Sequence, residues 1–187
     1  YRAHRRLLQL LQSGHRLDRW VLKAPSHLSQ LPALFAVYPD ARVVITHRDP
    51  LQVLGSLTNL MATLRGMRSR AVDYASVVWQ MSLGYEMLVQ RVVEQRAEGL
   101  LPEKQIFDIR YPDLIADPVG TLSRLYAWLD VDFPAGVLAS IETFLERRPQ
   151  DKRGFHQYEF ADTGLDLATE RAKYVNYQER YGVASEI

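Results

Sequence analysis

The chain has 187 residues, a length that suits one domain with a core of its own. Its hydrophobic fraction of 47% is typical of a globular protein, and its formal net charge of +1 excludes a strong overall attraction to nucleic acid. The sequence has no cysteine, which excludes disulfides, zinc–thiolate sites and a cysteine nucleophile. It has no apolar run of about 18 residues and no visible signal peptide, so we expect a cytoplasmic protein without a membrane span.

The apolar spacing and the turn residues predict a helix-rich α/β chain with a parallel sheet. The pattern predicts, in chain order, a helix over 2–12, a strand over 20–22, a helix capped by Ser26, a strand over 42–47, a helix from Asp49-Pro50, a helix over 73–98, a strand over 105–109, a helix from Asp117-Pro118, a helix over 135–147, an irregular stretch over 149–164 and a last helix over 167–181. The strand over 42–47 is hydrophobic without alternation, which is typical of a strand buried on both faces.

The helix that begins at Asp49-Pro50 has an apolar stripe at helical spacing, formed by Val53, Leu57, Leu60 and Leu64. We expect this stripe to face the core. The basic segment 65–70 follows, either as a solvated loop or as a loop that faces a ligand.

A candidate anion site lies where the strand over 42–47 ends. Arg48 ends the strand and the next helix starts at once, so backbone N–H groups and the positive helix end lie beside a guanidinium fork. Ser56 is a hydroxyl on an otherwise apolar stripe, and a phosphate oxygen can be its partner. The alternative is that Arg48 pairs with Asp49 or another carboxylate and that Ser56 bonds back to a carbonyl.

A second candidate group consists of a lysine and a histidine. Lys23 directly follows the apolar run over 20–22, and His27 lies at the start of the next helix. Histidine is the commonest general base near neutral pH, and a helix N-terminus favours its neutral form. Lys23 can place positive charge beside the group on which such a base acts. The alternative is a surface lysine and a capping histidine.

In this order and spacing, the motifs resemble the bacterial-type sulfotransferase family, which uses the donor PAPS (3′-phosphoadenosine 5′-phosphosulfate). The resemblance implies a three-layer, P-loop-like fold with a short parallel sheet. It rests on Leu-Lys-Ala-Pro-Ser-His-Leu over 22–28, Tyr-Pro-Asp-Ala over 38–41, Thr-His-Arg-Asp-Pro-x-x-Val-x-x-Ser over 46–56, the segment 110–118 and the tail from Arg153 to the last helix.

The resemblance implies the catalytic roles. His27 would deprotonate a hydroxyl or amine of the acceptor, and Lys23 would assist at the sulfonate. The acceptor would be a small molecule, a lipid or a glycan rather than a nucleic acid, and the product of the donor would be PAP. No metal takes part in this family. The oligomeric state stays open.

The resemblance also implies the nucleotide site. Arg48 and Ser56 would bind the 3′-phosphate, and Tyr111 would lie near the adenosine. Lys152, Arg153 and Gly154 stand where the family has a basic-glycine loop over the 3′-phosphate, although their order here is Lys-Arg-Gly rather than Arg-Lys-Gly.

One part of the family pattern is missing from the sequence. The ten glycines are scattered, and no Gly-rich loop that would hold the 5′-phosphosulfate is present. We therefore expect residues 1–187 to form a single, N-terminally truncated sulfotransferase-like domain. The alternatives are a catalytically inactive nucleotide-binding or interaction module of the same fold and a P-loop-type kinase.

Overall fold

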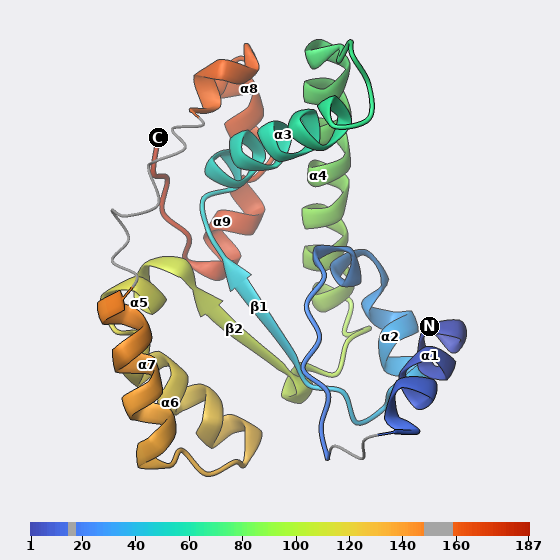
Figure 1. Cartoon of the computed structure of the whole chain (residues 1–187). Helices are drawn as coiled ribbons and strands as arrows, with labels where there is room; N and C mark the ends of the chain where they lie inside the picture. The colour runs from blue at the N-terminus through green and yellow to red at the C-terminus, as the bar shows by residue number, and fades with distance from the viewer. Residues whose placement is uncertain (15–17, 148–158) are drawn as a thin grey trace.

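The computed structural model describes residues 1–14, 18–147 and 159–187 as helices around a small sheet (Figure 1). The elements, with η for a 3₁₀ helix, are α1 (Arg2–Gln12), η1 (Pro25–Gln30), α2 (Leu31–Val37), β1 (Val43–His47), α3 (Pro50–Gly66), α4 (Tyr74–Ala97), η2 (Glu103–Gln105), β2 (Ile106–Arg110), α5 (Tyr111–Ala116), α6 (Pro118–Leu129), α7 (Ala135–Arg147), η4 (Phe160–Thr163), α8 (Leu167–Ala172) and α9 (Val175–Tyr181).

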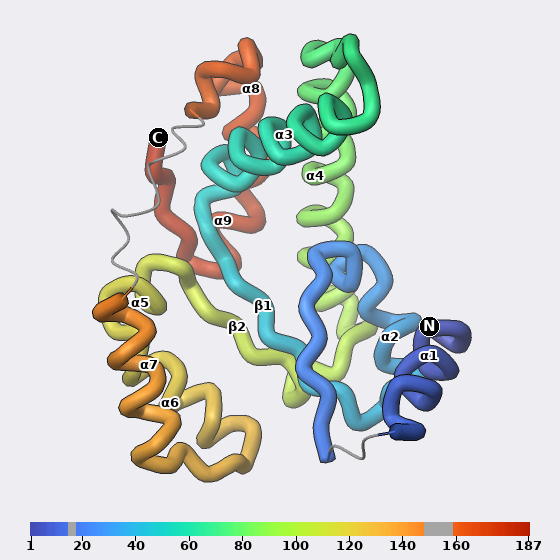
Figure 2. Tube along the Cα trace, in the orientation of Figure 1, coloured from blue at the N-terminus to red at the C-terminus, as the bar shows by residue number. Residues whose placement is uncertain are grey.

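The sheet consists of β1 and β2, which run parallel. Val43 lies opposite Ile106 and His47 lies opposite Arg110, so both strands end at the same edge. Helices α5 to α7 lie on one side of the sheet and α2 and α4 on the other (Figures 1 and 2). The predicted fold class, a helix-rich α/β fold with a short parallel sheet, is confirmed.

Two hydrophobic clusters hold these elements together. The first packs α2 and α4 against one face of the sheet, and its buried members are Leu31, Ile45, Val92, Leu101 and Ile106. The second joins α3 and α4 to the C-terminal elements, and its buried members are Leu51, Leu54, Val89, Phe160 and Tyr174. The second cluster therefore fixes the C-terminal part of the chain beside the start of α3, where the candidate anion site lies.

The aspartate caps are confirmed. Asp49 accepts a hydrogen bond from the Leu51 backbone N–H at 3.0 Å, and Asp117 accepts one from Gly120 at 2.8 Å. Each cap is followed by a proline at the first helical position, where the missing N–H costs nothing. This short pattern placed the start of α3 and of α6 correctly.

Two expectations near the N-terminus are wrong. Residues 20–22 are not a strand, because no strand of the described chain pairs with them; Val21 is 96% exposed. Ser26 does not cap a helix either. It lies inside η1, whose N-cap is Ala24, and its carbonyl accepts a hydrogen bond from Ser29 Oγ at 2.9 Å.

Three further expectations about packing are wrong. In β1, Ile45 and His47 are buried while Val44 and Thr46 are exposed, so only one face of the strand is covered. The last helix is interrupted between α8 and α9 at Tyr174, whose side chain is fully buried. In α3, the buried face is the one with Leu51, Leu54 and Thr58 rather than the predicted stripe.

Candidate active site

The carboxyl edge of the sheet brings two predicted nucleotide-binding residues together. Arg48 directly follows β1, and Tyr111 begins α5 directly after β2. Because the two strands end in register, the Arg48 guanidinium lies over the Tyr111 ring, 4.4 Å from its centroid. A cation over an aromatic face is attracted by the ring quadrupole, so Tyr111 fixes one face of the guanidinium.

A carboxylate from the far end of the chain binds the same guanidinium. Arg48 Nε lies 3.0 and 3.1 Å from the two Glu186 carboxylate oxygens, and Arg48 Nη2 lies 2.8 Å from Oε2. These bonds raise the pKa of Arg48 above its usual value. The alternative in which Arg48 pairs with a carboxylate is therefore realised, with Glu186 rather than Asp49 as the partner. Among the described residues, Arg48 Nη1 has no recorded hydrogen bond.

Asp49 fastens the C-terminal tail to the start of α3. Its side chain is fully buried and accepts bonds from the Leu51 N–H, from the Glu186 N–H at 2.6 Å and from Arg171 Nη2 at 3.0 Å. Arg171 also donates to the carbonyl of Ile187 at 2.8 Å. Burial alone would raise the pKa of Asp49, but these hydrogen bonds outweigh it and lower the pKa.

Ser56 lies on an exposed part of α3, where the described residues give its hydroxyl no recorded partner. Its neighbour Gly55 is in close contact with η4, since a Cβ at Gly55 would lie 3.4 Å from the backbone of Phe160. The predicted nucleotide-binding residues Lys152, Arg153 and Gly154 lie outside the described residues. The described chain resumes at Glu159, and Glu159 and Phe160 lie next to Gly55, the sequence neighbour of Ser56.

His47 lies under this edge and is 1% exposed. Its Nε2 lies 2.8 Å from Asp108 Oδ1 and its Nδ1 lies 2.9 Å from the Tyr177 hydroxyl, while its ring stacks on Tyr181 with centroids 4.1 Å apart. Arg96 binds the same Asp108 oxygen at 2.8 Å. Burial opposes ionisation of Asp108, but its bonds to His47 and Arg96 prevail and lower its pKa to about 2. His47 thus ties both strands to α9.

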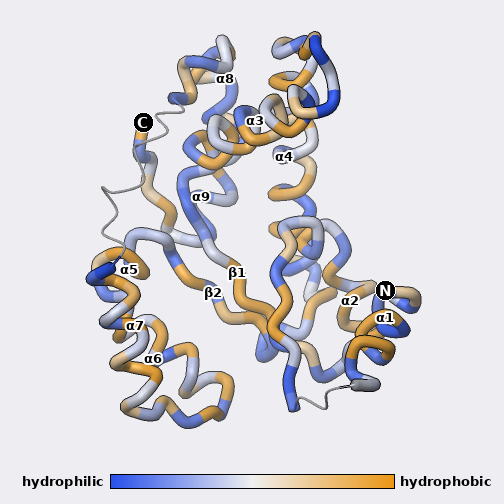
Figure 3. The backbone as a smooth tube through the Cα atoms, in the orientation of Figure 1, coloured by the Kyte–Doolittle hydropathy of each residue, from blue (hydrophilic) through white to orange (hydrophobic). Residues whose placement is uncertain are grey.

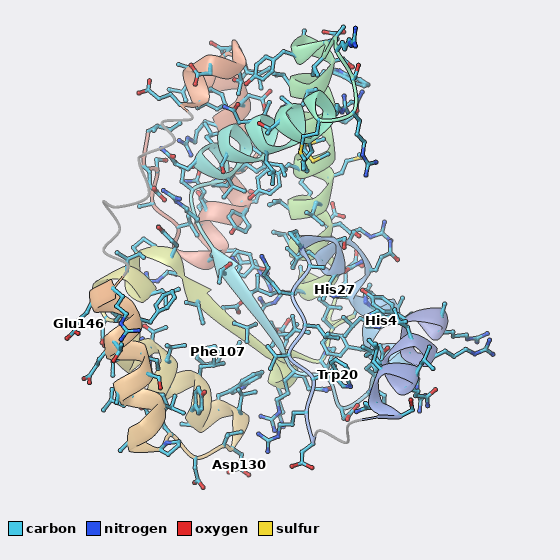
Figure 4. All side chains as sticks on the ribbon, viewed as in Figure 1. His4, Trp20, His27, Phe107, Asp130 and Glu146 are labelled. Carbon is cyan, nitrogen blue, oxygen red and sulfur yellow. The ribbon has the colours of Figure 1, made fainter. Side chains whose placement is uncertain are left out.

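The two predicted catalytic residues come from another part of the fold. His27 lies in η1, where its Nδ1 is 2.8 Å from the Tyr1 hydroxyl and its ring stacks on Tyr1. The His4 ring packs edge-on against the rings of Tyr1 and His27, and its Nδ1 lies 2.7 Å from the Tyr38 hydroxyl. Figure 4 shows the side chains of His4 and His27 next to each other, on the opposite side of the strands from α6 and α7.

Lys23 is exposed in the extended segment before η1. Within the described residues, no recorded contact joins Lys23 or His27 to Arg48, Ser56 or Tyr111. The structure therefore brings together Arg48 and Tyr111, places Ser56 farther along α3, and leaves the lysine–histidine motif as a separate group.

Three residues of this edge escaped sequence reasoning, namely Glu186, Arg171 and Tyr177. Arg171 and Tyr177 belong to the predicted last helix. The amphipathic pattern of a helix separates its apolar face from its polar face, but it does not identify the polar residues that contact other elements. Glu186 lies in a tail without any periodic pattern. Only the fold brings it to Arg48, which is 138 residues away in the sequence.

Comparison with known proteins gives a consistent set of matches. The model of the sulfotransferase family matches residues 1–135. The omega-hydroxy-beta-dihydromenaquinone-9 sulfotransferase Stf3 of Mycobacterium bovis is 30% identical over 133 residues, which are 70% of this chain and 31% of that protein. The protein of the same name from Mycobacterium tuberculosis gives the same values.

Two crystal structures of sulfotransferases resemble the fold. STF9 from Mycobacterium avium has a TM-score of 0.82 and 28% identity, covering 97% of this chain and 46% of that one. STF1 from Mycobacterium tuberculosis has a TM-score of 0.70 and 29% identity, covering 92% of this chain and 43% of that one. The chain thus spans about a third of the curated relatives and less than half of the solved ones.

Proposed function

Because this chain belongs to the sulfotransferase family, we propose that the protein transfers a sulfonate group from PAPS to a hydroxyl or amine acceptor. The observation that carries the proposal is the guanidinium of Arg48, which lies at the carboxyl edge of the sheet, rests on Tyr111 and binds an oxyanion through its fork. Open α/β folds bind ligands at this edge. A phosphate has the same bidentate geometry as the carboxylate now bound there.

The proposed 3′-phosphate site consists of Arg48 and Ser56, with Tyr111 beside the adenosine. Arg48 has an unengaged Nη1 in the described structure, so a phosphate can bind there or displace Glu186. Lys152, Arg153 and Gly154 are proposed to complete the site. This proposal is supported by Phe160, which is six residues beyond Gly154 in the sequence and lies against Gly55, the neighbour of Ser56.

In the proposed reaction, the acceptor oxygen or nitrogen attacks sulfur while the bond between sulfur and the bridging phosphate oxygen breaks. PAP leaves with that electron pair, and the acceptor proton passes to His27. The Tyr1 hydroxyl lies 2.8 Å from Nδ1 of His27. In the tautomer whose Nδ1–H donates to the Tyr1 oxygen, Nε2 carries the lone pair that would accept the proton. The ammonium of Lys23 would offset charge on the sulfonate oxygens.

We further propose that residues 1–187 are part of one sulfotransferase domain, truncated at its N-terminus. The sequence has no glycine-rich loop for the 5′-phosphosulfate, and the solved relatives are more than twice as long as the part that this chain covers.

The proposed acceptor is a lipid or another small molecule with a hydroxyl group. The name of the Mycobacterium bovis relative, an omega-hydroxy-beta-dihydromenaquinone-9 sulfotransferase, supports such an acceptor. We propose a cytoplasmic location, where PAPS would be available. No described helix of this chain is long and apolar enough to cross a membrane.

The test is acceptor-dependent release of PAP by the intact protein, followed by mass spectrometry with hydroxylated isoprenoid acceptors. The proposal predicts that PAP and a product heavier by one sulfonate group appear together, and that Arg48→Ala raises the KM for PAPS. Phosphate transfer from ATP instead would establish the kinase alternative. Binding of the nucleotide without sulfonation of the acceptors tested would support the alternative of a catalytically inactive nucleotide-binding module.

A further inference from the structure

The turn between α3 and α4 projects from the rest of the fold. We call residues 60–73 the α3–α4 tip. Figures 1 and 2 show it at the end of the molecule farthest from the base of the sheet. The buried residues of α3 all lie between Pro50 and Thr58, and no residue from Asn59 to Ser76 is buried. The last two turns of α3 therefore extend beyond the core.

An apolar stripe runs along this projecting part. Leu60 is 53% exposed, Leu64 is 45% exposed and Met67 is 77% exposed, and they follow one another at i, i+4 and i+7. They continue the stripe that helical periodicity assigns to the core. Leu64 and Met67, with Met61 and Val72, also line a groove of about 640 Å³ that Arg65 and Arg68 border. Exposed apolar side chains that gather along one groove with charged residues at its rim mark a candidate interaction surface.

The charge of the tip is one-sided. Arg65, Arg68 and Arg70 lie within six residues, and Asp73 is the sole acidic residue between Pro50 and Tyr85. Asp73 is itself engaged as the N-cap of α4. Throughout the described ranges, no ion pair involves any of these three arginines. Figure 3 shows this strongly hydrophilic turn next to hydrophobic segments of α3.

The tip is separate from the proposed donor site. Arg48 precedes the first turn of α3, and the 17 residues of this helix span about 25 Å. The anion that the tip arginines would bind is therefore not the nucleotide held by Arg48. A partner that matches both the arginines and the apolar stripe must present negative charge directly beside an apolar region.

We propose that the α3–α4 tip docks on the surface of an anionic phospholipid bilayer. The arginines bind lipid phosphates while Leu60, Leu64 and Met67 enter the boundary between headgroups and acyl chains. We commit to a bilayer because the tip combines the two features by which helices bind anionic membranes, namely basic residues that attract lipid headgroups and apolar side chains that insert beneath them. This inference does not depend on the proposed transfer reaction.

The test is co-sedimentation of the intact protein with vesicles of phosphatidylcholine, with or without roughly one-third phosphatidylglycerol, at low salt. The wild type should bind the anionic vesicles and bind pure phosphatidylcholine much less. The variant Arg65→Gln/Arg68→Gln/Arg70→Gln should partition about 10²-fold more weakly, since each basic residue near such a surface contributes about fivefold. The variant Leu60→Ser/Leu64→Ser/Met67→Ser should also lose binding with its charge unchanged.

The matched control is Arg2→Gln/Arg5→Gln/Arg6→Gln in α1, which removes the same charge from another exposed helix with exposed leucines. It should keep most of the binding. Thermal unfolding and circular dichroism establish that each variant is folded. The proposal is overturned if the wild type binds the two kinds of vesicle equally or binds neither. It is also overturned if the α1 variant loses vesicle binding while the tip variants keep it. Self-association that the serine variant abolishes, without vesicle binding, would assign the tip to a second copy and also overturns it.

Discussion

The carboxylate of Glu186 occupies two donors of the Arg48 guanidinium, at N···O distances between 2.8 and 3.1 Å. The same guanidinium is the group that we propose for the 3′-phosphate. The tail is held there by the bond from the Glu186 N–H to Asp49 and by the bond from Arg171 to the Ile187 carbonyl. A nucleotide must therefore share Arg48 with a resident anion or displace it.

Glu186→Gln should tighten the binding of PAP by about tenfold. The change removes a negative charge beside the incoming phosphate and weakens the bond that the phosphate must replace, and a charge-assisted hydrogen bond contributes about 1.5–3 kcal/mol. Isothermal titration calorimetry with PAP measures the effect. Glu103→Gln, which alters a similar contact with Arg96 away from this edge, should leave the affinity unchanged. Weaker binding by Glu186→Gln would show that Glu186 positions Arg48 rather than competes for it.

His27→Ala should lower kcat by about 10²–10⁴-fold, the range expected for loss of a general base. The matched control is His4→Ala, since His4 belongs to the same group of rings but binds Tyr38. It should change kcat by less than about threefold if its role is only structural. An unchanged kcat in His27→Ala would remove this residue from the mechanism.

Asp49→Ala should destabilise the fold by about 3–5 kcal/mol, because it removes a buried partner of Arg171 as well as a helix cap. Urea unfolding at neutral pH measures the change. Asp73→Ala provides the comparison, since Asp73 caps α4 from an exposed position and should cost about 1 kcal/mol. Equal losses in the two variants would mean that the contacts between Asp49 and the tail contribute nothing to stability.

Acid should destabilise the protein through Asp108. Its folded pKa of about 2 lies below the ordinary value of 3.8, so the unfolded chain takes up the proton first as the pH falls. The stabilisation is complete above about pH 5 and is lost progressively towards pH 2. Urea unfolding between pH 7 and pH 3 should show this loss, with a shallower pH dependence in Asp108→Asn. The same slope in both proteins would contradict the contribution of Asp108.

Local patterns predicted much of the architecture. Asp-Pro pairs marked the starts of α3 and α6, and apolar β-branched runs marked β1. The parallel order of the strands followed from their alternation with helices. These features are set within a few residues, so a single sequence is enough to find them.

Features that depend on distant partners could not be found in this way. The segment 20–22 has strand-like residues, but a strand also needs a neighbour, and the described chain offers none. Helix α3 carries two apolar stripes, and periodicity does not tell that Leu51 and Leu54 face the core while Leu60 and Leu64 do not. The sequence placed Arg48 and Tyr111 in the same nucleotide site, but it did not predict that the Arg48 guanidinium lies on the Tyr111 ring.

The most direct test of the nucleotide site is calorimetric titration of the intact protein with PAP and with 5′-AMP, which differ by the 3′-phosphate. We expect PAP to bind at least about tenfold more tightly than 5′-AMP, and we expect Arg48→Ala to abolish this preference because it removes the charge-assisted bonds to the phosphate. Arg42→Ala, at the opposite end of β1, should preserve the preference. Equal affinities for the two nucleotides, or a preference unchanged in Arg48→Ala, would contradict the assignment of Arg48 to the 3′-phosphate.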